Sequence, residues 1–380
     1  MAGVAAPISK LSANDRQLIR EAGLTWLRSG IAELDLKRFI RGERQPEAFY
    51  RTRDLIVGLR KEGFQIMGIT PGPSNVTTDL GPPGTPEYFE NYRRLCTFLG
   101  NEFKGLIDYW QVANEVDIWI FRATLTLEQA AEFLKAGLRG LKDADRRLKV
   151  GVNITLFPSM PGEVDGNTDR HEGVFIAKSI YHDPGLEVDY AGFDSYPGTW
   201  REGGVESWHE YLRAFHELVR KPIIIQEFGY SSAGDMMTEE ERASKAYPCQ
   251  LKKWRFSWKD AHTPEIQADF VSESYRIFAE EPFVLGATYY CWKDHATCWQ
   301  CKSPDCPAET AWGLVDRDNN PKPSYYSLKQ CLSAHFSGQC GHWNRHRSPG
   351  PQSQQHLRDR LSSGLERDYG VPKLEQPHRK

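Results

Sequence analysis

Short apolar runs alternate with longer amphipathic segments along most of the chain. A run of this kind, bounded by polar or turn-forming residues, is typical of a buried strand of an α/β protein. Eight such runs are found, at residues 3–8, 24–31, 64–70, 106–114, 148–154, 188–195, from 223 onward, and at 284–291. The pattern therefore predicts eight strands.

Each predicted strand is followed by a segment with apolar residues at helical spacing. These predicted helices run from Ser12 or Asn14 to Ala22 and over residues 48–61, 86–98, 127–141, 173–180, 208–219, 264–279 and 325–334. Thr126 and Gln129 form a capping box before the fourth helix. Strict alternation favours an α/β fold of the closed (β/α)8 TIM barrel type over an open doubly wound sheet. No G-x-G-x-x-G follows any predicted strand, so a dinucleotide-binding fold has no support.

The predicted barrel occupies residues 1–338, and the composition changes beyond it. Residues 339–380 are rich in Ser, Gln, Arg, His and Pro and have almost no apolar periodicity. This composition predicts a disordered C-terminal tail.

Composition and charge exclude several kinds of partner. The formal net charge of −3 gives no basic footprint, so neither nucleic acid nor an anionic membrane surface is an expected partner. The start of the chain, MAGVAAPISK, has no charged n-region and no long apolar h-region, which predicts a cytoplasmic protein, or a secreted one if a signal peptide was removed. Eight cysteines are too few for a disulfide scaffold of this size.

Two predicted strands end on a glutamate. In DYWQVANEVD the fourth strand ends on Asn114 and Glu115, and in KPIIIQEFGY the seventh ends on Glu227. Barrels place reactive side chains at these strand ends. Cleavage of a glycosidic bond needs two carboxyl groups, one protonated to donate to the leaving oxygen and one ionised to attack or stabilise the sugar carbon. The alternative is that each glutamate is a salt-bridged strand terminus.

These motifs resemble those of the clan A retaining glycoside hydrolases. The resemblance covers residues 3–335 and centres on VANE and QEFG, with an arginine ending strand two and an aromatic-rich strand eight ending in tryptophan. Families 5 and 39 come closest. The resemblance implies that Glu115 is the acid/base and that Glu227 is the nucleophile of a two-step mechanism with a covalent glycosyl-enzyme intermediate.

The resemblance also implies roles for four neighbours. Asn114 would hold the sugar 2-hydroxyl, and Tyr196 would hydrogen-bond the nucleophile. Arg28 would lie beside the nucleophile, and Trp292 would form the platform under the sugar in the −1 subsite. The alternatives are a rim salt bridge for Arg28 and a core phenol for Tyr196. The His-x-Tyr pattern common in family 5 is replaced by DSY at residues 194–196.

The neighbours of the two glutamates fit different protonation states. An arginine near Glu227 favours its ionised form, whereas a neutral amide and apolar neighbours can raise the pKa of Glu115. A retaining pair is expected to lie about 5 to 5.5 Å apart.

Three tryptophans and three aspartates are further candidates. Trp119, Trp200 and Trp299 fall in loops after strands four, six and eight, where indoles can stack on the apolar faces of sugars or simply pack under the loops. The further acids, each interpreted as a hydrogen-bond anchor, are Asp117, Asp194 and Asp294.

The loop after strand eight contains four potential metal ligands. They are His295, Cys298, Cys301 and Cys306, in D-H-A-T-C-W-Q-C-K-S-P-D-C. This set is enough for a tetrahedral structural zinc site; a disulfide between two of the cysteines, or free thiols, are the alternatives. The predicted chemistry itself needs no cofactor.

Together these features predict a retaining β-glycoside hydrolase whose partner is a carbohydrate, either a β-linked glycan, an oligosaccharide or a glycoside. Two alternatives stay open. A transglycosylase would use the same carboxylate pair, and a non-catalytic carbohydrate-binding barrel would keep the fold without turnover.

Overall fold

The computed structural model describes residues 1–76, 78–155, 157, 172–244 and 246–336. Residues Met1–Phe336 form one compact unit. The predicted disordered tail lies outside the described residues. No helix in the described part of the chain has both the length and the apolar character needed to cross a membrane.

Parallel strands form one large sheet. They are β1 (Ala2–Ala5), β2 (Trp26–Gly30), β3 (Gln65–Ile69), β4 (Tyr109–Gln111), β5 (Lys149–Gly151), β6 (Asn153–Ile154), β7 (Ala191–Asp194), β8 (Ile223–Phe228) and β11 (Val284–Tyr289). Their order is β5-β4-β3-β2-β1-β11-β8-β7-β6. The two outer strands of this order, β5 and β6, are separated only by Val152, so they are one interrupted strand. The sheet therefore closes on itself as a TIM barrel with eight strand positions, and the predicted fold is confirmed.

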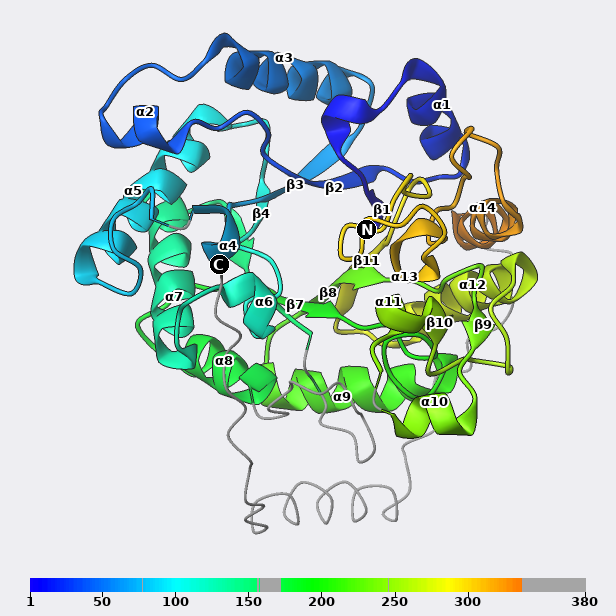
Figure 1. The fold of residues 1–380 in the computed structure, drawn as a ribbon. Coiled ribbons are helices and arrows are strands. Elements are labelled where there is room, and N and C mark those ends of the chain that lie inside the picture. The colour runs from blue at the N-terminus through cyan, green and yellow to red at the C-terminus, as the bar shows by residue number, and fades with distance from the viewer. Residues whose placement is uncertain (77, 156, 158–171, 245, 337–380) are drawn as a thin grey trace. The chain divides into compact units, whose positions relative to one another are not determined.

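Helices surround the strands in chain order (Figure 1). The long ones are α1 (Ala13–Glu21), α3 (Glu47–Lys61), α5 (Pro86–Glu102), α7 (Leu127–Ala144), α8 (Glu172–Tyr181), α9 (Trp208–Val219), α12 (Pro264–Glu280) and α14 (Pro323–Phe336). Each matches a predicted helix. The capping box of Thr126 and Gln129 before α7 is present, which satisfies backbone groups that would otherwise lack partners at that helix end.

Side chains on opposite faces of the strands fill two different spaces. Along β8, Ile223 and Ile225 belong to the large cluster between strands and helices, whereas Ile224 faces the barrel interior. Gln226 also crosses the interior, where its Nε2 donates to Tyr190 at 3.1 Å. Each fully buried apolar side chain of this size, such as Ile223, Ile224 or Ile225, contributes about 1.5–3 kcal/mol to the stability of the fold.

The loops that follow the strands carry short elements that the apolar pattern did not predict. They are α2 (Leu36–Ile40), α4 (Pro73–Val76), α6 (Trp119–Arg122), α10 (Glu239–Ala243), α11 (Pro248–Leu251), α13 (Pro307–Thr310), the 3-10 helices η1 (Ile8–Lys10) and η2 (Val205–Ser207), and a two-stranded sheet of β9 (Asp235–Met236) and β10 (Lys253–Trp254).

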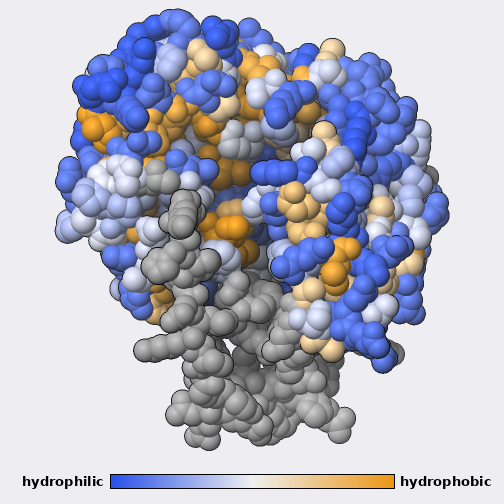
Figure 2. Space-filling view, in the orientation of Figure 1, coloured by the Kyte–Doolittle hydropathy of each residue, from blue (hydrophilic) through white to orange (hydrophobic). Residues whose placement is uncertain are grey.

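A second, smaller cluster of buried residues joins the loops after β7, β8 and β11. It includes Tyr196, Trp254 and Trp312. In the orientation of Figure 1, the surface is mostly hydrophilic and is hollowed near its centre, with apolar residues on the floor of the hollow (Figure 2).

Candidate active site

Glu115 lies just beyond β4, where the backbone leaves the sheet in a left-handed conformation. Ala113 has φ 56° and Glu115 has φ 47°. Such a conformation costs a residue with a Cβ about 1–2 kcal/mol. Hydrogen bonds from neighbouring strands offset this cost. Ala113 N donates to Thr70 Oγ1 at 2.9 Å, and Glu115 N donates to Asn153 Oδ1 at 3.0 Å. This turn directs Asn114 and Glu115 to the end of the barrel.

Glu227 lies near the end of β8, where the pairing with β7 is irregular. Phe193 pairs with Ile225 and Asp194 pairs with Glu227, so Gln226 is an extra residue in β8. Gln226 already points into the barrel, and the next side chain of a regular strand would point outward. Because a bulge re-aims the side chain that follows it, Glu227 also faces the barrel interior.

Arg28 connects the ends of the two glutamate strands. It is 3% exposed and lies in β2. Its Nη1 donates to Glu227 Oε1 at 2.5 Å, and its Nη2 donates to Asn114 Oδ1 at 2.6 Å. Its Nε donates to Gln111 Oε1 at 2.7 Å. A guanidinium stays protonated in proteins, so a fixed positive charge lies against Glu227.

Tyr196 donates its phenolic proton to the other oxygen of Glu227, Oε2. Burial, followed by the negative charge of Glu227, raises the pKa of Tyr196 well above its ordinary value. The phenol therefore stays a hydrogen-bond donor, and Glu227 has a donor on each oxygen.

Three carboxyl groups share the space at these strand ends. One oxygen each from Glu115, Asp194 and Glu227 lies within 4.8 Å of the other two. Burial raises the pKa of Glu115 well above its ordinary value, and the charge of Glu227 raises it further. Thr155 Oγ1 donates to Glu115 Oε1 at 3.0 Å. Burial and the charge of Glu227 also raise the pKa of Asp194. Closely spaced buried carboxylates resist joint ionisation, which favours the protonated forms of Glu115 and Asp194.

We expect Glu115→Gln to raise the melting temperature, and to raise it more as the pH increases. The folded-state pKa of Glu115 lies above its ordinary value of 4.5, so the stability of the wild type falls as the pH rises from that value through the folded-state pKa. Glutamine has nearly the same shape and does not titrate. Thermal unfolding should show little difference at pH 4 and a gain of at least about 2 °C at pH 8.

The matched control for this prediction is Glu187→Gln, because the side chain of Glu187 is 53% exposed. Its melting temperature should follow that of the wild type at both pH values. A difference between Glu115→Gln and the wild type that stays constant with pH would contradict the prediction.

Trp292 does not lie in the −1 subsite, where the resemblance implies that it forms the sugar platform. Its side chain is 2% exposed, and its indole N–H donates to Asp15 Oδ1 at 2.8 Å. Its ring lies edge-on to Tyr325. These partners belong to α1 and α14, in the outer helical layer. The expectation that Trp292 forms the sugar platform is therefore corrected. The physical reason is that β11 ends at Tyr289, so Trp292 lies three residues past the strand, and its side chain contacts α1 and α14.

We therefore expect Trp292→Ala to lower the free energy of unfolding by about 3–5 kcal/mol, because it leaves a cavity between helices. Trp292→Phe keeps a six-membered ring, loses the hydrogen bond to Asp15 and leaves a smaller cavity than alanine, and should cost about 1–3 kcal/mol. Urea unfolding measures both changes. A Trp292→Ala variant that unfolds like the wild type but has lost turnover would restore the platform interpretation.

Tyr290 and Glu309 lie at the site but were not predicted from the sequence. Tyr290 directly follows β11, is partly exposed, and has its ring centre 6.2 Å from that of Tyr196. Its hydroxyl donates to Glu309 Oε2 at 3.3 Å. Burial raises the pKa of Glu309 to about 7. The two tyrosines that end the strand run VLGATYYC were the available signal for Tyr290, whereas nothing in the local sequence of Glu309 marks it.

The three loop tryptophans differ in how much of their rings is accessible. Trp119 is 49% exposed and Trp299 is 40% exposed. Phe121 in α6 contacts Trp299, with ring centres 6.1 Å apart, so the loops after β4 and β11 meet there. Trp200 instead stacks on Tyr247 at 5.5 Å, which covers one of its faces. Stacking on a ligand is therefore easier for Trp119 and Trp299.

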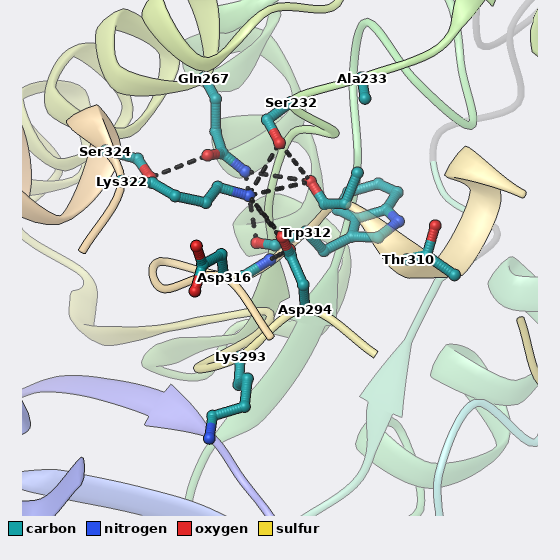
Figure 3. A network of polar contacts seen from close by, with 12 residues as sticks. Ser232, Ala233, Gln267, Lys293, Asp294, Thr310, Trp312, Asp316, Lys322 and Ser324 are labelled. Atoms are coloured by element: carbon teal, nitrogen blue, oxygen red, sulfur yellow. Dashed lines mark hydrogen bonds and ion pairs between the residues drawn. The ribbon is translucent and has the colours of Figure 1, made fainter. Parts of the chain in front are cut away.

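Asp117 and Asp294 each accept hydrogen bonds that join one loop to another segment of the chain. Asp117 Oδ2 accepts from the backbone N–H of Thr155 at 2.8 Å. Asp294 accepts from Lys322 Nζ at 3.1 Å, and Lys322 also donates to Ser232 at 2.8 Å (Figure 3). This ion pair links the loops after β8 and β11 to the start of α14.

The metal-ligand candidates differ from the predicted set by one residue. Four sulfur atoms lie within 4.8 Å of one another, those of Cys249, Cys298, Cys301 and Cys306. His295 does not belong to this group, because its Nε2 faces the sulfur of Cys291 at 3.9 Å. The predicted four-ligand set with His295 is therefore corrected. Cys249 was missed because it lies 49 residues before Cys298 in another loop.

The sequence matches no protein-family model and no curated protein, but its fold matches solved structures. A family 39 glycoside hydrolase from Bacteroides cellulosilyticus WH2 aligns with a TM-score of 0.60 and 16% identity, over 87% of this chain and 63% of that one. A β-D-glucuronidase from Dictyoglomus thermophilum aligns with a TM-score of 0.52 and 16% identity, over 84% and 46%. A GH2 β-galacturonidase from Eisenbergiella tayi aligns with a TM-score of 0.54 and 14% identity, over 87% and 50%.

These similarities establish a shared fold. The protein has the TIM-barrel architecture found in glycoside hydrolases. The chain spans between 46% and 63% of the length of these three neighbours.

Proposed function

We propose that this protein is a retaining β-glycoside hydrolase acting on a β-linked glycan, oligosaccharide or glycoside. The observation that carries the proposal is the pair of Glu115 and Glu227, which have oxygens within 4.8 Å of each other and opposite surroundings. Glu227 accepts from a guanidinium and a phenol, whereas Glu115 is buried with a raised pKa. An inverting pair needs about 6.5–9.5 Å to accommodate a water molecule, so the short separation supports double displacement. The shared fold with glycoside hydrolases supports the same class of reaction.

In the first step, Glu227 attacks the anomeric carbon while Glu115 gives its proton to the leaving oxygen. The bond to the leaving group breaks and a covalent glycosyl-enzyme forms. Glu115, now ionised, then takes a proton from water, and the resulting hydroxide displaces Glu227. Arg28 and Tyr196 stabilise the carboxylate that is released.

Asn114 and Tyr290 are the residues best placed to orient the sugar. Asn114 Oδ1 accepts from Arg28 and Gln111, which turns its Nδ2 toward a donor role to the 2-hydroxyl. Tyr290 takes the platform role first assigned to Trp292, because its partly exposed ring lies beside Tyr196.

The test is a panel of nitrophenyl β-glycosides that includes the glucoside, galactoside, xyloside, glucuronide and galacturonide. NMR of the first product should show retained anomeric configuration. Inversion would overturn the mechanism. Transfer products without hydrolysis would favour a transglycosylase, and ligand binding without any release would favour a carbohydrate-binding barrel.

A further inference from the structure

We propose that Cys249, Cys298, Cys301 and Cys306 together bind one structural zinc ion, held by four thiolates at the rim of the barrel. The four residues come from two loops that are far apart in the sequence. Cys249 lies in α11, after β8, and the other three follow β11. None of these four cysteines is in a disulfide.

The distances between the sulfur atoms fit a tetrahedral zinc site. A Zn–S bond of about 2.3 Å places the sulfur atoms of a tetrahedron about 3.8 Å apart. The sulfur of Cys249 lies 3.5 Å from that of Cys298 and 3.7 Å from that of Cys306. A disulfide would require about 2.0 Å and would join only two of the four. Convergence of all four sulfurs within 4.8 Å of one another is what a shared ion requires.

The local backbone and the burial also suit a closed structural site. Between Cys298 and Cys301 only two residues intervene, and Lys302 N donates to Cys298 O at 2.8 Å, which turns both sulfurs to the same side. Cys298 and Cys306 are fully buried, Cys249 is 9% exposed, and Cys301 is exposed on the outer side of the group. Lys252 Nζ donates to Asp305 at 2.7 Å, which joins the segment after Cys249 to the residue before Cys306.

The ion would supply the stability that these loops lack. The helices α11 and α13 have four residues each, too few to be stable alone. Cys306 is the N-cap residue of α13, and that helix carries Glu309. Gln300, between the cysteines, donates to Glu309 Oε1 at 3.0 Å. Zinc would therefore hold Glu309 in place beside Tyr290. This last step rests on the proposed function, whereas the zinc site itself does not.

Elemental analysis of the purified full-length protein tests the site. We expect one zinc per chain in the wild type, falling to about a tenth or less in Cys249→Ser and in Cys301→Ser after dialysis against a weak chelator. The matched controls are His295→Ala and Cys291→Ser, from the same region, which should both keep one zinc per chain. Replacement of the zinc by cobalt should give the visible absorption of a tetrahedral thiolate complex in the wild type.

Three results would overturn the proposal. They are substoichiometric zinc in a wild type whose intact mass reveals a disulfide, iron in place of zinc, and loss of zinc in His295→Ala with retention in Cys249→Ser. If the cysteine variants do not fold, the wild-type zinc content and cobalt spectrum still decide the question. Because both readouts are independent of turnover, an inactive protein with one zinc per chain would refute the proposed function and leave the zinc site intact.

Discussion

Replacement of Glu227 by alanine should abolish hydrolysis of every β-glycoside, with a fall in kcat on the order of 10⁴-fold or more. The reason is that, in the proposed mechanism, the covalent intermediate can form only on this carboxylate. Added azide should restore cleavage by attacking the anomeric carbon directly, and the product should then have inverted configuration. Steady-state kinetics and NMR of the azide product measure the two effects.

A control for folding is needed, because Glu227 is the buried partner of Arg28. Removing one member of a buried ion pair costs about 3–5 kcal/mol, so Glu227→Ala can lose activity by unfolding. Glu227→Gln keeps an acceptor for Arg28 and should be nearly as inactive while it unfolds closer to the wild type. A folded Glu227→Gln protein with wild-type turnover of natural glycosides would remove Glu227 from the mechanism.

The fold was predictable because each local signal agreed with the others. Apolar runs of strand length alternated with helical periodicity, and Thr126 with Gln129 marked the start of α7. The ends of the strands were less predictable. The run at residues 106–114 continues past Gln111, where β4 ends, because apolar residues in a left-handed turn look like those of a strand.

The site was predictable only where barrel topology decides the geometry. Side chains at the ends of parallel barrel strands converge, and the structure brings Arg28 and Tyr196 to Glu227 and Asn114 to Arg28. The prediction for Trp292 was wrong because β11 ends at Tyr289, two residues before the predicted end, and beyond the strand the Trp292 side chain contacts α1 and α14.

The contacts between loops could not be predicted from the sequence. Cys249 joins the cysteines after β11 only because α11 folds beside that loop, and Glu309 reaches Tyr290 only through the position of α13. Neither loop has an apolar periodicity that fixes its path, so sequence reasoning placed His295 in the metal site instead.

Replacement of Glu115 by alanine should impair turnover in a different way from replacement of Glu227, because in the proposed mechanism Glu115 supplies a proton and forms no bond to the sugar. Natural glycosides have poor leaving groups, so their turnover should fall by about 10²–10⁴-fold. Aryl glycosides with activated leaving groups need little protonation, and their first step should remain close to the wild-type rate. The second step still lacks its base, so the glycosyl-enzyme should accumulate.

This difference gives Glu115→Ala a set of signatures that can be measured separately. Rapid mixing should reveal a burst of released phenol, and intact-mass analysis should detect the glycosyl-enzyme. Azide should release the sugar with retained configuration, because it displaces Glu227 from an intermediate that has already inverted once.

The raised pKa of Glu115 adds a pH signature. In the wild type, kcat/KM should fall as the pH rises through that pKa and the acid loses its proton, and this alkaline limb should be absent from Glu115→Ala with activated substrates.

Asp194→Asn is the matched control for Glu115→Ala, because Asp194 belongs to the same buried carboxyl group cluster and also has a raised pKa. Asp194 accepts from Asn153 Nδ2 at 2.6 Å, and in the proposed mechanism it donates no proton to the leaving group. Azide should therefore not accelerate turnover by Asp194→Asn, and no glycosyl-enzyme should accumulate.

If azide gives retained product with Glu227→Ala and inverted product with Glu115→Ala, the roles of the two glutamates are exchanged. If Asp194→Asn alone accumulates the intermediate, the acid/base is Asp194.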